Sequence, residues 1–350
     1  MSRREPTRSW TLPRRRRVVT PLIWAFLLFA AAAPGSASAR GYLPAPGTLF
    51  QGEAGLPASS YERAVGKHPA VYEEFSAWGE YLPAIFKNAA DAQARLMIHI
   101  TTASGTRELI TPQGIADGQG DAWLTSLGRA IAASGRVVYI RLMAEMDGYW
   151  NPYSAFNANG SSRGSAHSTA AFQRAWKRVA LILRGGSLPK LDAELAQLGM
   201  PRLHASGDLP RGKVAMLWVP QVAGAPSIAA NQPRAYWPGG QWVDWIGTDF
   251  YSKFPNFPGL NSFYDSFPGE PFMFGEWALW GADNPGFVDQ LFGWIGSHPR
   301  TRMLIYNQGI RTDGPFRLSR YPHAAASLRR HLAGARFPAF APEWALAGQS

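Results

Sequence analysis

The most informative stretch of the sequence is Val137-Val138-Tyr139-Ile140-Arg141-Leu142-Met143-Ala144-Glu145-Met146-Asp147-Gly148-Tyr149-Trp150. Six of its first seven residues are apolar or aromatic and three are β-branched, which predicts a buried β-strand. The apolar run ends at a carboxylate, Glu145, and the aromatic residues Tyr149 and Trp150 follow. This order fits a strand-end site that transfers a proton beside a stacking surface for sugar rings. Taken alone, it also fits a structural glutamate that is solvated or paired with Arg141.

A second stretch repeats the same order of residue types and reads Pro271-Phe272-Met273-Phe274-Gly275-Glu276-Trp277. Here too an apolar run of strand length ends in a glutamate that is followed by an aromatic residue. Hydrolysis of a glycosidic bond uses two carboxyl groups, one as acid and one as base or nucleophile. The two strand ends therefore predict a pair formed by Glu145 and Glu276.

Eight short apolar runs divide the chain, and the connections between them are as long as a helix or longer. The runs are continuously apolar rather than alternating, which is typical of parallel strands buried on both faces. We therefore expect an α/β fold, a (β/α)8 TIM barrel, whose strand ends meet at one mouth. A doubly wound open sheet is the alternative, but its glycine-rich first turn is missing. The expected strands cover residues 48–50, 69–75, 96–100, 137–143, 213–220, 242–251, 271–276 and 302–306.

The connections carry fewer signals. Helical spacing predicts helices over residues 121–134, from 168 to 183, around 191–198 and in the second half of 284–297. Residues 151–167 and 254–270 are expected to be loops, and the tail from Phe337 is expected to pack outside the barrel. Glu73 and Glu74 lie side by side in a predicted strand, so they face opposite sides and are expected to be structural.

The first 39 residues resemble a secretory signal peptide. Residues 1–17 contain seven arginines and one acid, residues 18–33 are almost entirely apolar, and Ala37-Ser38-Ala39 offers a small-x-small cleavage site. We expect cleavage after Ala39, export to the cell envelope or medium, and a single domain over residues 40–350. The arginine cluster leaves a twin-arginine signal open. The alternative is an uncleaved anchor, which would be the only reason to expect membrane attachment.

Charge and cysteine content exclude several classes of function. The chain has 35 Lys and Arg residues and 24 Asp and Glu residues. Residues 1–39 contain seven of the basic and one of the acidic residues, so the rest of the chain has 28 basic and 23 acidic residues and a net charge of +5. That balance does not indicate a nucleic-acid partner. The sequence contains no cysteine, so disulfides, thiolate metal ligands and a cysteine nucleophile are excluded.

Three motifs, taken in order, resemble those of glycoside hydrolase family 26. That family consists mainly of β-mannanases, with some enzymes that cleave xylan or mixed-linkage glucan. The resemblance extends from about residue 60 to about residue 310 of the chain. The motifs are Arg141-x-x-x-Glu145-x-Asp147-Gly148-x-Trp150, then Tyr236-Trp237-Pro238-Gly239 with Val243-Asp244-Trp245-Ile246-Gly247-Thr248-Asp249-Phe250-Tyr251, and finally Phe274-Gly275-Glu276.

The resemblance implies that Glu145 is the acid/base at the end of strand four and Glu276 the nucleophile at the end of strand seven. It also implies that Tyr251 touches Glu276. The expected reaction is a retaining double displacement on β-mannan or a related hemicellulose or glucan, with no metal and no organic cofactor. We expect the enzyme to act as a monomer on a polysaccharide or oligosaccharide.

The other substrate-site candidates follow from their positions. Arg141 shares a strand face with Glu145 and is expected to neutralise buried carboxylates, and Asp147 is expected to raise the pKa of Glu145. His99, on the third predicted strand, either faces the mouth or is a hydrogen-bonded core histidine. The expected stacking platforms for sugar rings are Tyr149, Trp150 and Trp277.

Two positions depart from the family pattern. Ala144 stands where the family usually has histidine and the wider clan asparagine, and Asp147 stands where the family has asparagine. The first departure leaves mannan specificity open. It also keeps open a catalytically weak or inactive glycan-binding barrel, and an anchored envelope protein is a third possibility.

Overall fold

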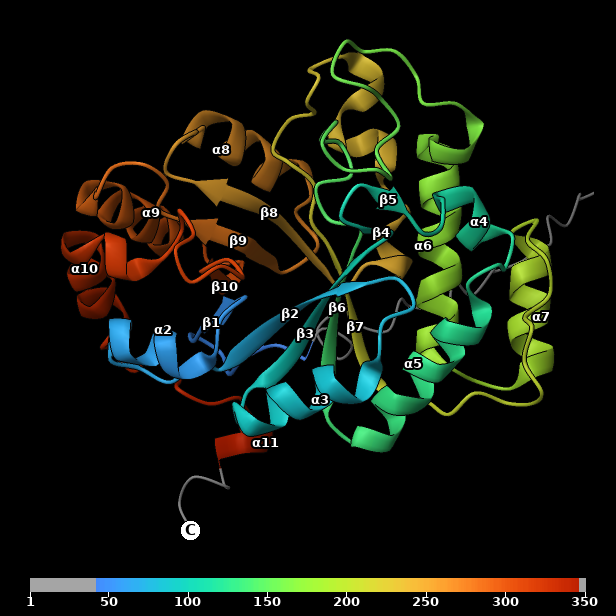
Figure 1. Cartoon of the computed structure of the whole chain (residues 1–350), viewed down its shortest axis with the longest axis horizontal. Helices are drawn as coiled ribbons and strands as arrows, with labels where there is room; N and C mark the ends of the chain where they lie inside the picture. The colour runs from blue at the N-terminus through green and yellow to red at the C-terminus, as the bar shows by residue number, and fades with distance from the viewer. Residues whose placement is uncertain (1–41, 346–350) are drawn as a thin grey trace, which may run out of the picture. The chain divides into compact units, whose positions relative to one another are not determined.

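The computed structural model describes residues 42–345, and a closed barrel of eight parallel strands organises this part of the chain (Figure 1). The strands pair in the order β1-β10-β9-β8-β7-β6-β3-β2, so the barrel closes between β2 and β1. The predicted (β/α)8 fold is confirmed, whereas the expected signal peptide lies outside the described residues. The barrel strands are β1 Phe50–Ala54, β2 Val71–Ala77, β3 Arg95–Thr101, β6 Val137–Leu142, β7 Lys213–Trp218, β8 Trp245–Tyr251, β9 Phe272–Ala278 and β10 Thr301–Asn307.

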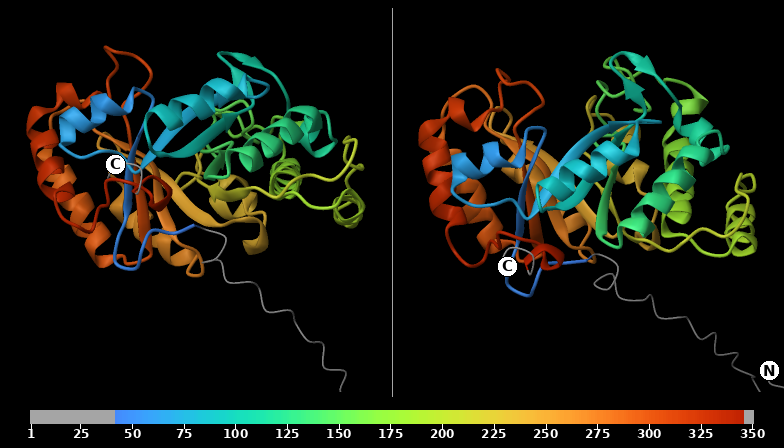
Figure 2. Two further views of the ribbon diagram at one scale, coloured as in Figure 1. Left: turned by 90° about the horizontal axis from the view of Figure 1, so that it is seen from below. Right: turned by 60° about the horizontal axis from the view of Figure 1, so that its bottom comes forward.

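Helices surround the strands, as the two further views in Figure 2 show. A short hairpin, β4 Ala103–Ser104 and β5 Arg107–Glu108, follows β3. The α-helices are α2 Ala58–Val65, α3 Leu82–Asp91, α4 Pro112–Ala116, α5 Asp121–Ser134, α6 Thr169–Arg184, α7 Leu188–Gln197, α8 Phe257–Ser266, α9 Pro285–Ser297, α10 Pro322–Leu332 and α11 Pro342–Ala345. The 3₁₀ turns are η1 Ser165–His167, η2 Ala229–Asn231, η3 Pro233–Tyr236, η4 Gly240–Trp242 and η5 Leu318–Arg320. Within residues 42–345, no helix is both long and apolar enough to cross a membrane.

Two helices begin at an asparagine that caps the free N–H groups of the first turn. The side chain of Asn256 accepts a hydrogen bond from Gly259 N in α8, and Asn284 accepts one from Phe287 N in α9. A proline follows in the first turn of each helix. The expectation of a loop in place of α8 was wrong, and α9 is helical throughout rather than in its second half. Asn and Pro are typical of turns, but they also start helices.

The carboxy-terminal tail closes the end of the barrel where the strands begin. Trp344 of α11 belongs to the same buried cluster as Val137 and Tyr139 of β6. The carboxylate of Glu343 pairs with Arg95 at the start of β3, at 2.6 Å. The tail is therefore part of the core at the lower end of the barrel, which corrects the expectation that it packs outside.

Candidate active site

Arg141 of β6 stands at the centre of a charged network inside the barrel. Its Nη1 donates hydrogen bonds to Glu73 Oε1 at 3.0 Å and to Glu276 Oε1 at 2.5 Å, and its Nη2 donates to Asp249. These carboxylates come from β2, β9 and β8, so only a side chain that points into the barrel can reach all three. The guanidinium is fully buried, and the Glu276 carboxylate together with the hydrogen bonds to Glu73 and Asp249 supplies the compensation that a buried charge requires.

His99 of β3 belongs to the same network and is neutral. Its Nδ1 lies 2.8 Å from Arg141 Nη1, and because a guanidinium can only donate, Nδ1 accepts and Nε2 carries the proton. Burial and the neighbouring Arg141 charge lower the pKa of His99 to about 4. The buried Nε2 has no hydrogen-bond partner among the described residues. His99 thus contributes a neutral ring to the site.

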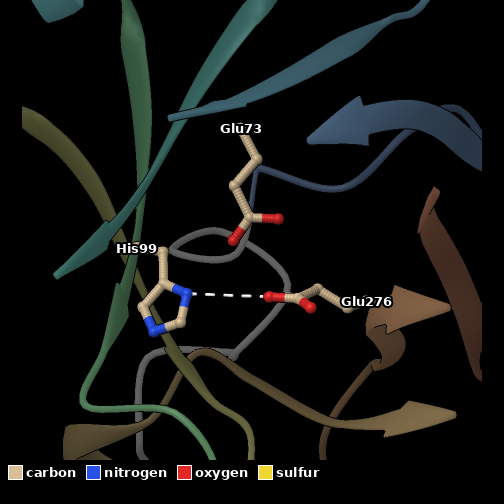
Figure 3. A group of neighbouring side chains, drawn as sticks. All are labelled: Glu73, His99 and Glu276. Atoms are coloured by element: carbon tan, nitrogen blue, oxygen red, sulfur yellow. Dashed lines mark ion pairs between the residues drawn. The ribbon is translucent and has the colours of Figure 1, made fainter. Parts of the chain in front are cut away.

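Glu73, His99 and Glu276 point toward one another in a way that resembles a metal site (Figure 3). One ligand atom from each lies within 4.8 Å of the others. Arg141 Nη1, however, lies within 3.0 Å of an atom of all three. The guanidinium therefore occupies the place where these donors could hold a metal ion, and we interpret the group as the binding pocket of Arg141.

Both oxygens of Glu276 accept hydrogen bonds. Oε1 accepts from Arg141, and Oε2 accepts from the Tyr251 hydroxyl and, at 2.6 Å, from Asn307 Nδ2. Burial alone would raise the pKa of Glu276, but the Arg141 charge and the hydrogen bond from Tyr251 outweigh it and hold that pKa well below its usual range. Glu276 is therefore an ionised and firmly oriented carboxylate.

Glu145 lies just beyond the end of β6 in a left-handed backbone conformation, with φ of 51°. Such a conformation is unfavourable for a residue with a side chain. Neighbouring contacts maintain it, because Glu145 N donates to Val219 O at 2.7 Å and Oε1 accepts from Gln221 Nε2 at 2.5 Å. The other oxygen, Oε2, accepts from Trp150 Nε1 at 2.6 Å. The strained turn directs the carboxyl group toward the mouth.

The surroundings of Glu145 shift its pKa in the direction opposite to that of Glu276. Burial raises the pKa of Glu145, and the negative charge of Glu276 raises it further. Asp249 contacts the backbone of Glu276, since its Oδ1 accepts from Glu276 N at 2.8 Å. Burial, together with the charges of Glu276 and Glu145, raises the pKa of Asp249 well above its usual range despite the Arg141 contact. A carboxyl with a raised pKa beside an ionised carboxyl can act as the acid of an acid and nucleophile pair.

Gly275 makes room for this network. The pairing of β9 with both neighbours shifts register around this residue, so the bulged backbone turns Glu276 into the barrel. A Cβ atom at Gly275 would lie 2.9 Å from both Arg141 Nε and Asp249 Oδ1. A side chain at this position would enter the centre of the site.

Two predicted site residues do not face the mouth. Asp147 is fully buried, and its Oδ1 accepts from Gln221 N at 2.9 Å, so it positions the residue that holds Glu145 and cannot contact a substrate. Burial raises the pKa of Asp147 to about 8. Trp277 is 1% exposed and packs against Tyr306, with ring centroids 4.9 Å apart. It points outward because its strand neighbour Glu276 points inward, so the expected stacking role was wrong.

Tyr149 and Trp150 are 44% and 50% exposed, and their rings meet edge to face with centroids 5.3 Å apart. A Cβ atom at Gly148 would lie 2.4 Å from the Trp150 ring, so glycine lets that ring fold back to reach Glu145. Arg163 fixes the same loop by donating to the carbonyl of Tyr149. Two exposed rings therefore lie on the loop beside Glu145.

Ala144 is buried in the barrel interior, in the same cluster as Leu217 and Val219. Its carbonyl accepts from the Tyr153 hydroxyl at 2.6 Å. The short side chain therefore fills a packed position and leaves no ring next to the acid/base candidate.

Several members of the site were not predicted from the sequence. Glu73 and Asp249 share strand faces with residues of the network, and the alternation of side chains could have identified them. Asn307 ends β10, as the glutamates end their own runs. Gln221, in contrast, lies in the long connection after β7, and its sequence surroundings carry no comparable signal.

No family model matches the chain. A β-1,3-xylanase from Alcaligenes sp and the β-1,3-xylanase TXYA from Vibrio sp are each 26% identical to it over 140 residues. The match covers 40% of this chain and 22% of each relative. The chain thus spans little more than a fifth of the length of the curated relatives that it matches.

Solved structures, an endo-β-1,4-mannanase among them, share the fold. A double mutant of the endo-β-1,4-mannanase from Cellulomonas fimi aligns with a TM-score of 0.56 at 15% identity, covering 88% of this chain and 74% of that one. GH26A from Muricauda sp. MAR_2010_75 aligns with a TM-score of 0.55 at 15% identity, covering 86% and 94%. At these identities the likeness establishes the barrel architecture.

Proposed function

We propose that this protein is a secreted, retaining glycoside hydrolase that cleaves a β-linked polysaccharide by double displacement. The observation that carries the proposal is the opposite environment of two strand-end carboxyls. Burial and the charge of Glu276 favour the protonated form of Glu145, whereas Arg141 and Tyr251 favour the ionised form of Glu276. A retaining glycosidase requires this division of roles.

In the first step, Glu276 attacks the anomeric carbon while Glu145 gives its proton to the glycosidic oxygen, which leaves as an alcohol. The product is an ester between the glycone and Glu276. In the second step, the ionised Glu145 removes a proton from water, and the resulting hydroxide displaces Glu276 from the anomeric carbon. Tyr251 and Asn307 orient the nucleophile, and Trp150 supports both the acid and the departing sugar.

The substrate class rests on the relatives and on the exposed rings. The fold neighbours include an endo-β-1,4-mannanase and the sequence relatives are β-1,3-xylanases, so a β-linked hemicellulose is the best-supported substrate. Export rests on the leader over residues 1–39. Mass spectrometry of the exported protein tests this part, with a mature chain beginning at Arg40 as the expected result and an intact leader as the contradicting one.

A panel of β-mannan, glucomannan, β-1,4-xylan, β-1,3-xylan and mixed-linkage glucan, assayed for new reducing ends, tests the activity. We expect cleavage of at least one polymer, and NMR of the first product should show the β-anomer before mutarotation. Release of the α-anomer would contradict a retaining mechanism. Binding without cleavage across the panel would favour the second candidate, an inactive glycan-binding barrel, which the absence of a polar side chain at Ala144 supports.

A further inference from the structure

A second group of aromatic side chains lies beside the nucleophile candidate, on the loops that follow β8 and β9. The Trp280 ring packs edge to face against Tyr251, with centroids 5.9 Å apart, and against Phe254, with centroids 5.7 Å apart. Phe254 is 64% exposed. The aromatic surface thus runs continuously from the residue that holds Glu276 to solvent. We call Lys253, Phe254 and Trp280 the Trp280 platform.

The platform is fixed before any ligand arrives. Ser252 N donates to Ala278 O at 3.0 Å, and the Ser252 hydroxyl accepts from Trp280 N at 2.8 Å. These contacts join the loop after β8 to the loop after β9. Phe316 packs against the platform, with its ring centroid 5.2 Å from those of both Tyr251 and Trp280. A surface with preset geometry loses little conformational entropy on binding.

Lys253 adds a positive charge that has no ion-pair partner in the described part of the chain. Its Nζ lies 4.5 Å from the centroid of Trp280 and 5.5 Å from that of Phe254, and it forms no ion pair with any acid among residues 42–345. Two acids on the loops that follow β9 and β10 are engaged elsewhere. Asp313 pairs with an arginine, and Asp283 accepts from two backbone N–H groups at the start of α10. The ammonium group is therefore available to a ligand.

The platform lies on the nucleophile side of the site. Tyr251, which its rings contact, donates to Glu276, and the sugar that becomes bonded to a nucleophile is the glycone. Trp150, in contrast, donates to Glu145 and so marks the side of the leaving group. Sugars that stack on Trp280 and Phe254 therefore belong to the glycone.

We infer that the Trp280 platform is a glycone subsite for a sugar that carries an anionic group, either a carboxylate or a sulfate. The rings stack on the sugar, and the Lys253 ammonium pairs with the anion. The assignment to the glycone rests on the proposed function, because it uses Glu276 as the nucleophile.

Binding measurements with oligosaccharides of one backbone test this inference. The probes are β-1,4-mannohexaose, the β-1,4-linked mannuronate hexamer, which differs by a carboxylate on each sugar, and O-sulfated mannohexaose. Titration calorimetry on the full-length Glu276→Ala protein avoids turnover. We expect at least one anionic probe to bind more tightly than the neutral one at low salt, with the advantage shrinking as salt screens the charge. The stronger anionic probe identifies the group.

Substitutions assign this preference to Lys253. In the Glu276→Ala background, Lys253→Gln should weaken binding of the preferred anionic probe by roughly five- to tenfold and leave mannohexaose unchanged. Lys253→Arg should retain the preference, Trp280→Ala should weaken all probes, and Lys190→Gln, on the exposed face of α7, should change nothing. Equal binding of neutral and anionic probes, or a preference that survives Lys253→Gln, would overturn the inference.

The two proposals fail separately. A Lys253-dependent preference in a protein that cleaves no glycan would support the anionic-sugar site and contradict the hydrolase. Retaining cleavage of a polysaccharide without any preference for anionic probes would contradict only the anionic-sugar site.

Discussion

The two carboxyls of the site differ in how their oxygens are paired. Glu276 receives donors from a guanidinium, a phenol and an amide. Glu145 receives only neutral donors, from an indole and an amide. A charged donor stabilises a carboxylate more than a neutral donor does. The effect of burial therefore dominates at Glu145, whose pKa is raised, and is outweighed at Glu276, whose pKa is lowered. The acid and nucleophile roles that we propose thus rest on which side chains reach each glutamate.

Removing the Tyr251 hydroxyl should change the pH profile of the enzyme. The hydrogen bond that Tyr251 donates favours the ionised form of Glu276, so Tyr251→Phe should let the pKa of Glu276 rise. Because the attacking form is ionised, the acid limb of kcat against pH should move to higher pH. We expect kcat to fall by about 10- to 100-fold. Tyr149→Phe is the control, and an acid limb that stays in place in Tyr251→Phe would contradict the contact.

Gly275 offers a test of packing in the site. Gly275→Ala places a Cβ atom 2.9 Å from Arg141 Nε, so it should destabilise the fold and abolish turnover. Gly293→Ala in α9 is the matched control, since nothing lies within 4 Å of its Cβ position, and it should stabilise the helix by about 1 kcal/mol. Thermal unfolding compares the two. A Gly275→Ala protein with normal activity would show that the network tolerates the added atom.

At the scale of elements, the strands were predictable and the connections were not. Continuous apolar runs predict parallel strands because both faces are buried, and seven of the eight barrel strands overlap such runs. The exception is β1, which shares only Phe50 with the expected run over residues 48–50 and contains Gln, Gly and Glu. Successive side chains of a strand point to opposite faces, so Glu276 and Trp277 cannot both face the site. The expected stacking role of Trp277 was wrong because it ignored this alternation.

The helix α8 was not predicted because Asn256 and Pro258, which begin it, are also typical turn residues. The left-handed conformation of Glu145 and the contact of Gln221 with its carboxyl group depend on tertiary contacts that no local sequence pattern encodes.

The short helix α11 contributes more to stability than its length suggests. Trp344 is almost fully buried among residues that begin the barrel strands, and Arg136 stacks over its ring at 3.9 Å. Trp344→Ala should lower the free energy of unfolding by about 3–5 kcal/mol. Urea denaturation measures this, with the half-exposed Trp150→Ala as the control. A loss below that of Trp150→Ala would show that the tail does not close the barrel.

At the scale of the whole molecule, buried acids couple stability to pH. Burial raises the pKa of Glu53, Glu73 and Asp147 to about 8 each. Glu73 and Asp147 belong to the candidate site, whereas Glu53 does not. Between the unfolded value of about 4.3 and about 8, the native state holds protons that the unfolded state has released. The free energy of unfolding should therefore fall as pH rises through this window, by at most about 1.4 kcal/mol per pH unit and group.

Glu53 allows this effect to be measured away from the catalytic residues. One of its oxygens accepts from Gln308 Nε2 at 2.9 Å, and the other has no partner within the described structure. Glu53→Gln removes one titrating group, so stability should fall less steeply between pH 5 and pH 8 than in the parent protein. Glu62→Gln, on the exposed face of α2, should leave the slope unchanged. An unaltered slope in Glu53→Gln would contradict the raised pKa.

The most direct test of the central claim is azide rescue of the two glutamate variants on an activated aryl β-glycoside. Glu276→Ala should lose turnover, because no glycosyl ester can form. In Glu145→Ala the activated leaving group departs without a proton, so the glycosyl ester forms and its hydrolysis becomes slow. Added azide should then restore turnover and yield the β-glycosyl azide. Equal, modest losses in both variants with no rescue by azide would contradict the assignment of Glu145 as acid/base and Glu276 as nucleophile.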